Sequence, residues 1–107
     1  MKTITTEELK AKLERGDAFQ LVMAFDGWRF RAAHIPGSRG IGSLTAAQEV
    51  LAVDDEIVVY CTSQDCTASK MLYQALEEAG YTNLRRYSGG VQGWQEAGYP
   101  LEGDRVT

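Results

Sequence analysis

The sequence predicts an α/β protein in which a parallel sheet is covered by helices on both faces. Residues 57–60 are four β-prone residues without a polar member, as is typical of a buried parallel strand. Residues 67–79 carry apolar side chains at helical spacing and precede Gly80, which indicates a helix with one apolar face that ends at a glycine. Segments of these two kinds alternate along the chain, and such alternation predicts parallel strands joined by helices.

The N-terminal helix is expected to begin after Thr5. Thr5 and Glu8 have the spacing of a capping box, and Ile4 can pack on Leu9 as a hydrophobic staple. This helix should end at Gly16. The other expected elements are a strand at 19–24, a short amphipathic helix at 28–33, a Pro-Gly turn at 36–37, a very short strand at 38–41, a helix from the Ser43 cap to Leu51, the strand at 57–61, the helix at 67–79, a strand at 84–87, a turn at 88–90 and a short helix that includes Trp94.

The size and composition of the chain limit its possible functions. Residues 1–107 are expected to form a single domain, in which 44% of residues are hydrophobic and 24% charged. A formal net charge of −4 argues against nucleic acid or an acidic membrane as a partner. The first sixteen residues hold no apolar signal core, and no run reaches transmembrane length, so we expect a cytoplasmic protein. Two cysteines and one histidine cannot supply four zinc ligands, and we expect no metal or other cofactor.

Cys61 is the strongest candidate for a functional residue, because it lies where the apolar strand ends and a loop leads into a helix. The unpaired amides of such a loop and the positive end of the helix dipole favour the thiolate, which is the nucleophilic form. In parallel sheets the active crevice lies at the carboxyl ends of the strands, where Cys61 falls. We therefore expect a reactive cysteine with a thiol pKa below the free value of about 8.5. The alternative is an inert core cysteine.

Several motifs support this interpretation through a resemblance to a known family. His34-Ile-Pro-Gly-Ser is similar to a His-Ile-x-Gly-Ala turn, and residues 57–61 are similar to a strand that delivers a catalytic cysteine. Residues 79–81 and 87–94 are similar to a carboxyl-terminal signature, which residues 97–101 close. In this order and spacing they resemble the rhodanese family, the single-domain sulfurtransferases. The resemblance implies a five-stranded parallel sheet flanked by helices on both faces, with Cys61 as the catalytic residue. The substrate-binding loop that it implies consists of Thr62, Ser63, Gln64, Asp65, Cys66 and Thr67.

The implied activity is sulfur transfer through a covalent intermediate. The Cys61 thiolate attacks a sulfur donor and keeps its outer sulfur as a persulfide, which a second nucleophile then removes. Backbone N–H groups of the loop can hold this anion without any side chain. The partners implied are a small-molecule sulfur donor or a persulfide carrier, and a thiol or cyanide-like acceptor. The loop from Cys61 to Cys66 has the length used by similar sulfurtransferases, and related phosphatases use a loop one residue longer.

The chain departs from the family pattern within this loop. Family loops commonly read Cys-x-x-Gly-x-Arg, but Gln64 replaces the glycine and Cys66 the arginine, while Asp65 adds a negative charge. A site for a dianion such as thiosulfate would use an arginine here, so a less charged donor is favoured. Cys66 is either a resolving thiol for Cys61 or a small hydrophobe at the start of the helix. Thr62 has a hydroxyl that either bonds the persulfide or caps backbone groups.

A second departure concerns the support of the loop. The family's Asp-x-Arg is replaced by Met23 and Phe25, and the sequence does not show whether the nearby Asp26 and Arg29 substitute for it. Two other functions therefore stay open: a thiol redox or sulfur-relay protein that uses Cys61 and Cys66, and a non-catalytic regulatory module.

Outside the loop, other conspicuous residues are assigned structural roles. His34 is interpreted as a hydrogen-bonding corner of its turn rather than an acid–base group. Trp28 and Trp94 are expected to be packing residues. Arg85 and Arg86 alternate in and out of their strand and are interpreted as ordinary exposed charges. Gly89 and Gly90 are expected to supply positive φ angles for the turn.

Overall fold

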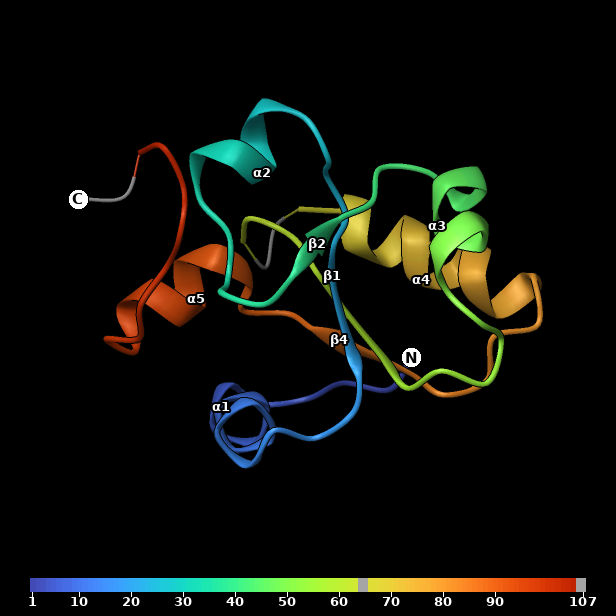
Figure 1. Ribbon diagram of the computed structural model, residues 1–107, viewed down its shortest axis with the longest axis horizontal. Helices are drawn as coiled ribbons and strands as arrows, with labels where there is room; N and C mark the ends of the chain where they lie inside the picture. Colours follow the sequence, from blue (N-terminus) through green and yellow to red (C-terminus); the bar gives the residue numbers. More distant parts are fainter. Residues whose placement is uncertain (64–65, 106–107) are drawn as a thin grey trace.

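The protein is described by a computed structural model that places residues 1–63 and 66–105 (Figure 1). Strands and helices alternate along these residues, as predicted. The elements are α1 (Thr6–Arg15), β1 (Gln20–Met23), α2 (Trp28–Ala32), β2 (Arg39–Gly40), α3 (Leu44–Val50), β3 (Ile57–Tyr60), α4 (Ala68–Glu78), β4 (Leu84–Tyr87) and α5 (Gly90–Glu96).

The strands form one parallel sheet in the order β2-β1-β3-β4. β3 lies inside the sheet, where Val59 pairs with Val22 of β1 on one side and with Arg86 of β4 on the other. All four residues of β3 have no exposed surface, which confirms the prediction drawn from their apolar run. The residue that follows β3 therefore emerges from the centre of the sheet.

Helices cover both faces of this sheet, which confirms the predicted layers (Figure 1). α3 and α4 lie on one face, where Leu76 of α4 shares a core with Val59. α1 and α5 lie on the opposite face, where Leu9 and Trp94 share a second core with Val58. Successive residues of β3 thus point into different cores, as expected from the period of two residues along a strand.

The expected five-stranded sheet is wrong for the described residues, which contain four strands. The fifth position beside β4 is reduced to a single parallel bridge between Thr3 and Arg86. Two backbone hydrogen bonds flank this bridge, from Arg86 N to Lys2 O at 2.8 Å and from Ile4 N to Arg86 O at 3.1 Å. α1 begins at Thr6, three residues after Thr3, so the chain turns into a helix instead of continuing along β4.

The predicted helix ends match the structure closely. Thr5 caps α1 and forms the predicted capping box with Glu8, and Gly16 ends the helix in a left-handed conformation with φ of 72°. Ser43 caps α3 by accepting a hydrogen bond from Ala46 N at 3.2 Å. These features are local in sequence, which explains why the pattern predicts them.

Two large side chains contradict their predicted packing roles. Met71 occupies an apolar position of α4 but is 66% exposed, and Trp28 at the start of α2 is 61% exposed. Trp94, in contrast, is 2% exposed and donates its indole N–H to Pro100 O at 2.9 Å. The apolar stripe of α4 is wider than the part that reaches the sheet, so Met71 stays outside the core. Within the described residues, no helix combines the length and apolarity needed to cross a bilayer.

Candidate active site

Cys61 lies at the carboxyl end of β3, where the sequence predicts the reactive residue. It directly follows Tyr60, whose carbonyl accepts a hydrogen bond from Ala24 N at 2.9 Å, so the sheet is still paired at this point. Cys61 is 1% exposed. The position is that of the crevice at the carboxyl edge of a parallel sheet.

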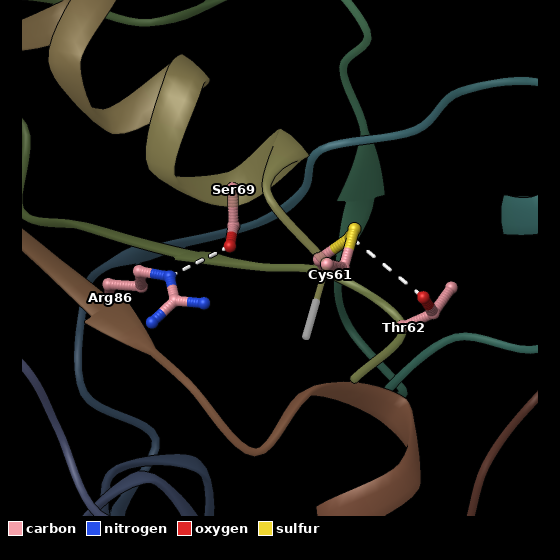
Figure 2. The surroundings of a disulfide bond; sticks show 5 residues. Cys61, Thr62, Ser69 and Arg86 are labelled. Carbon is pink, nitrogen blue, oxygen red and sulfur yellow. Dashed lines mark hydrogen bonds between the residues drawn. A yellow bond between two sulfur atoms is a disulfide. The ribbon is translucent and has the colours of Figure 1, made fainter. Parts of the chain in front are cut away.

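The sulfur of Cys61 is bonded to that of Cys66 in a disulfide (Figure 2). The two Cα atoms are 6.3 Å apart, so the loop brings the two cysteines together as the resolving-thiol hypothesis requires. In this state Cys61 carries no thiolate and cannot act as a nucleophile. Nucleophilic attack by Cys61 therefore requires that the disulfide is first opened. Whether Cys66 acts as a resolving thiol in solution stays a prediction.

The first two carbonyl groups of the loop are held by the start of α5. Cys61 O accepts a hydrogen bond from Val91 N at 3.0 Å, and Thr62 O accepts one from Gln92 N at 2.9 Å. In a trans peptide the N–H lies opposite the C=O, so these bonds turn the amides of Thr62 and Ser63 away from α5. Carbonyl oxygens, which would repel a sulfur anion, are thereby turned toward α5.

Gly90 makes the close approach between α5 and the loop possible. It has a left-handed φ of 64°, and a Cβ atom built on it would lie 2.5 Å from Cys61 O and 2.8 Å from the carbonyl carbon of Thr62. Only glycine fits this backbone without displacing the loop. Gly89 has a φ of −64°, so the predicted positive φ is confirmed for Gly90 and wrong for Gly89.

The remaining residues of the predicted loop differ in what they contribute. Thr62 Oγ1 lies 3.9 Å from Cys61 Sγ, close enough for a weak hydrogen bond (Figure 2). The amide of Cys66 donates to Ser63 O at 3.2 Å, so this N–H is already used. Thr67 precedes α4 without a side-chain cap. The predicted loop residues 64 and 65 lie outside the described residues.

Arg86 is a further candidate site residue, and the prediction that its charge is exposed to solvent is wrong. It is 6% exposed rather than solvated, and its Nε donates to Ser69 Oγ at 2.9 Å (Figure 2). Its Nη2 is buried and has no hydrogen-bond partner within the described residues. The signal that could have found it is the strand period, because Arg86 shares a strand face with Leu84, which is in the core below α4.

His34 has the contacts of the structural corner residue that the sequence predicts. Its Nδ1 donates to Phe30 O at 2.7 Å, and its ring stacks on that of Phe30 with 3.9 Å between centroids. Its backbone pairs with Glu102 through two hydrogen bonds of 2.8 and 2.9 Å. These contacts join α2 to the C-terminal segment.

Tyr60 ties the same turn to β3. Its hydroxyl accepts from Ile35 N at 3.0 Å and lies 2.7 Å from Ser38 Oγ. Ser38 Oγ donates to Ile35 O at 2.6 Å, so Tyr60 supplies the proton in its contact with Ser38. Burial raises the pKa of Tyr60 to about 12, and the phenol stays neutral in the physiological range. This network anchors the turn next to the residue that precedes Cys61.

The residues in place of the family's Asp-x-Arg form no charged support for the loop. Met23 is fully buried in the core on the α1 side. Phe25 carries the guanidinium of Arg29 over its ring at 4.4 Å, and the same guanidinium lies 5.3 Å from the Trp28 ring. Asp26 and Arg29 line a cavity beyond the end of β1, which is described below.

A cavity of about 470 Å³ lies next to the end of the loop. It is bounded by residues 24–29 at the end of β1 and the start of α2, by residues 42–44 at the start of α3, and by residues of α4 between 68 and 75. Ala68, two residues after Cys66, lines it together with Met71, whereas Cys61 does not. Its volume is in the range of small-molecule sites. The cavity therefore lies beside the loop and does not surround Cys61.

The fold and site define a class: an α/β domain with a cysteine at the carboxyl end of an inner parallel strand, followed by a short loop and a helix. A family model described as a rhodanese-like domain matches residues 5–97. The chain therefore belongs to the rhodanese-like domain family.

Solved structures agree with this assignment. The rhodanese-like domain of an Anabaena protein has a TM-score of 0.86 and 25% identity, covering 98% of this chain and 81% of that one. The thiosulfate sulfurtransferase of Pseudomonas aeruginosa has a TM-score of 0.82 and 23% identity, covering 97% of this chain and 20% of that one. A human single-domain sulfurtransferase has a TM-score of 0.74 and 23% identity, covering 90% of this chain and 96% of that one. A search of curated proteins finds no match.

Proposed function

We propose that the protein is a sulfurtransferase that moves sulfane sulfur from a donor to a thiophilic acceptor through a persulfide on Cys61. The observation that carries the proposal is the placement of Cys61 after a fully buried strand of a rhodanese-like fold. The loop carbonyls at Cys61 and Thr62 are bonded to α5, which favours amides on the side of the sulfur. Two structural neighbours that carry the name sulfurtransferase add support.

The reaction needs two displacements at sulfur. The Cys61 thiolate attacks the sulfane sulfur of the donor, a sulfur–sulfur bond forms, and the donor's remaining group leaves with the electron pair of the bond that breaks. The thiolate of the acceptor then attacks the outer sulfur of the Cys61 persulfide. Cys61 leaves as a thiolate and is ready for the next cycle. The intermediate is an anion, and backbone amides stabilise it without further proton transfer.

The loop chemistry favours a donor with little negative charge. The position of the family's loop arginine is Cys66, and Asp65 adds an anion to the loop sequence. We therefore propose a low-molecular-weight persulfide or a persulfide carrier protein as donor, and a thiol as physiological acceptor. The cavity beside the loop offers space for the organic part of a small donor. Cyanide serves as an acceptor in the assay.

The disulfide supports a resolving step as a second use of the loop. The Cys66 thiolate attacks Cys61 Sγ of the persulfide, hydrosulfide leaves with the electron pair, and the Cys61–Cys66 disulfide forms. Two equivalents of an external thiol then restore both cysteines and are themselves oxidised to a disulfide. The bonded state in the structure is the product that this step requires.

A turnover assay with reduced protein tests the proposal. Thiocyanate formation from cyanide is measured with a glutathione persulfide donor and with thiosulfate, for the wild type, Cys61→Ser and Cys66→Ser. We expect turnover that depends on Cys61 and is faster with the persulfide. Turnover that is equal in Cys61→Ser, or absent with every donor, contradicts the proposal. Hydrosulfide release that is undiminished in Cys66→Ser contradicts the resolving step alone.

A further inference from the structure

The starting observation is a buried cation on β4, the strand that pairs with β3. Arg86 is 6% exposed, and its guanidinium makes one side-chain hydrogen bond among the described residues, from Nε to Ser69 Oγ. Nη2 is buried without a partner there. The Ser69 hydroxyl is neutral, so it satisfies one donor and leaves the charge uncompensated.

A guanidinium in such a place requires an anion. Arginine cannot lose its proton in a protein, and burial of an unpaired charge is costly. None of the ion pairs among the described residues includes Arg86. The positive end of the α4 dipole lies close by, because Ser69 is in the first turn of that helix, and it disfavours a cation there. The Arg86 charge and the positive end of the α4 dipole together create a positive potential that stabilises an anion near the start of α4.

The backbone places this cation next to the candidate nucleophile. Arg86 pairs in register with Val59, two residues before Cys61, and Ser69 follows Cys66 by three residues. Val59, which pairs with the backbone of Arg86, and Ser69, which accepts a hydrogen bond from its guanidinium, thus belong to β3 and α4, the elements at the two ends of the loop. In the view of Figure 2, the guanidinium extends from β4 toward the loop that carries Cys61.

We propose that Arg86 is a positioning residue that stabilises the anionic sulfur of Cys61, first as thiolate and then as persulfide. It supplies from β4 the positive charge that the loop itself lacks at Cys66. Because the guanidinium is buried, it acts on the charge of Cys61 and does not bind the outer part of a donor. The persulfide half of this proposal rests on the proposed function, and the thiolate half does not.

The other charged groups around the loop define the controls. Asp65 is part of the loop, Lys70 is on α4, Glu96 is on α5 and Asp26 lies beyond β1. Lys70, Glu96 and Asp26 are exposed, so 1 M salt screens them, whereas a buried charge is screened much less. Asp65 is a carboxylate of the loop sequence and is tested by mutation.

The test is the thiol pKa of Cys61, measured from the rate of iodoacetamide alkylation against pH. All variants carry Cys66→Ser, so that only Cys61 reacts. Arg86→Gln removes the charge and keeps a donor for Ser69, whereas Arg86→Lys keeps the charge. Arg85→Gln removes a charge from the adjacent position, which points to the opposite face of the sheet.

The proposal expects Arg86→Gln to raise the Cys61 pKa by about one to three units, the effect of losing a nearby opposite charge. Arg86→Lys and Arg85→Gln should stay close to the wild type, and the difference should persist in 1 M salt. The rise should also persist in an Asp65→Asn background. An unchanged pKa in Arg86→Gln, an equal rise in Arg85→Gln, or loss of the effect in Asp65→Asn overturns the proposal.

Circular dichroism shows whether each variant folds. If Arg86→Gln does not fold, Arg86→Met, which keeps an unbranched side chain and removes the charge, replaces it: a raised Cys61 pKa supports the proposal, and an unchanged one overturns it. The outcome is separable from that of the proposed function. A protein with an Arg86-dependent pKa but no sulfur loading contradicts sulfur transfer only, and a protein that loads sulfur without this dependence contradicts the role of Arg86 only.

Discussion

The contact between Gly90 and the loop offers a sharp test of how the site is built. Replacing Gly90 with alanine adds one methyl group at a backbone with φ of 64°. The new Cβ would lie 2.5 Å from Cys61 O and 2.9 Å from Ser63 N, both of which are backbone atoms. Backbone cannot rotate away as a long side chain can. The loop or α5 must therefore move, and the bonds from Val91 N and Gln92 N are expected to lengthen.

The magnitude follows from two separate effects. A left-handed backbone costs an L side chain about 1–2 kcal/mol. Overpacking of a tight contact adds about 1–3 kcal/mol. Gly16→Ala is the matched control, because Gly16 has a similar φ of 72° but nothing within 4 Å of its added Cβ. Gly16→Ala should show the first effect alone, and Gly90→Ala should show both.

Urea unfolding and Cys61 alkylation of the reduced proteins measure the two consequences. We expect Gly90→Ala to be less stable than Gly16→Ala by about 1–3 kcal/mol. We also expect only Gly90→Ala to change the Cys61 alkylation rate, because only there does the loop shift. Equal stabilities and equal Cys61 rates would refute the argument that α5 orients the loop through Gly90.

Further predictions concern the disulfide, the Tyr60 hydroxyl and the α1 cap. Oxidised wild type should transfer no sulfur until a thiol reductant is added, whereas Cys66→Ser should be active without it; equal activity of the oxidised and reduced wild type in the turnover assay would contradict this. Tyr60→Phe should lower the free energy of unfolding by about 1–3 kcal/mol in urea, because it leaves the buried Ile35 N–H unpaired, and an unchanged midpoint would contradict it. Because the folded pKa of Tyr60 is raised to about 12, the unfolded chain binds fewer protons above its own value of about 10. Stability should thus be complete below about pH 10 and fall as the pH rises toward 12, and the fall should be smaller in Tyr60→Phe. Thr5→Ala should cost about 1 kcal/mol in thermal or urea unfolding by removing the α1 cap, and no loss would argue against the capping box.

Local patterns predict most of this fold. The capping box at Thr5 and Glu8, the Ser43 cap and the buried strand over residues 57–60 each depend on neighbours in sequence, and all are present. The fifth strand was implied by family resemblance alone. The described residues have one bridge at Thr3 in its place, because the chain enters α1 at Thr6 instead of continuing along β4.

The errors at side chains come from long-range packing. Met71 fits the helical period of α4, but which part of an apolar stripe meets the sheet depends on the position of neighbouring elements. The sequence predicts an exposed Arg86 side chain because charged residues are mostly exposed. The alternation of β4 was recognised, but the hydroxyl that accepts from Arg86 belongs to Ser69, seventeen positions away. Sequence patterns do not reveal such a pairing.

The placement of Cys61 was predictable and the orientation of its loop was not. An apolar strand followed by a cysteine and a helix predicts a residue at the carboxyl edge of the sheet. The hydrogen bonds from Val91 N and Gln92 N to the loop carbonyls depend on how α5 returns to β3. A glycine pair before a short helix does not specify that contact.

The most direct test of the central claim is the mass of the intact reduced protein after incubation with glutathione persulfide, followed by peptide mapping. The account predicts one added sulfur atom on Cys61 in Cys66→Ser and its removal by an added thiol, whereas the wild type either keeps this sulfur or releases it as hydrosulfide and forms the Cys61–Cys66 disulfide. No added sulfur on Cys66→Ser, or the same addition to Cys61→Ser, would contradict the claim that Cys61 carries the transferred sulfur.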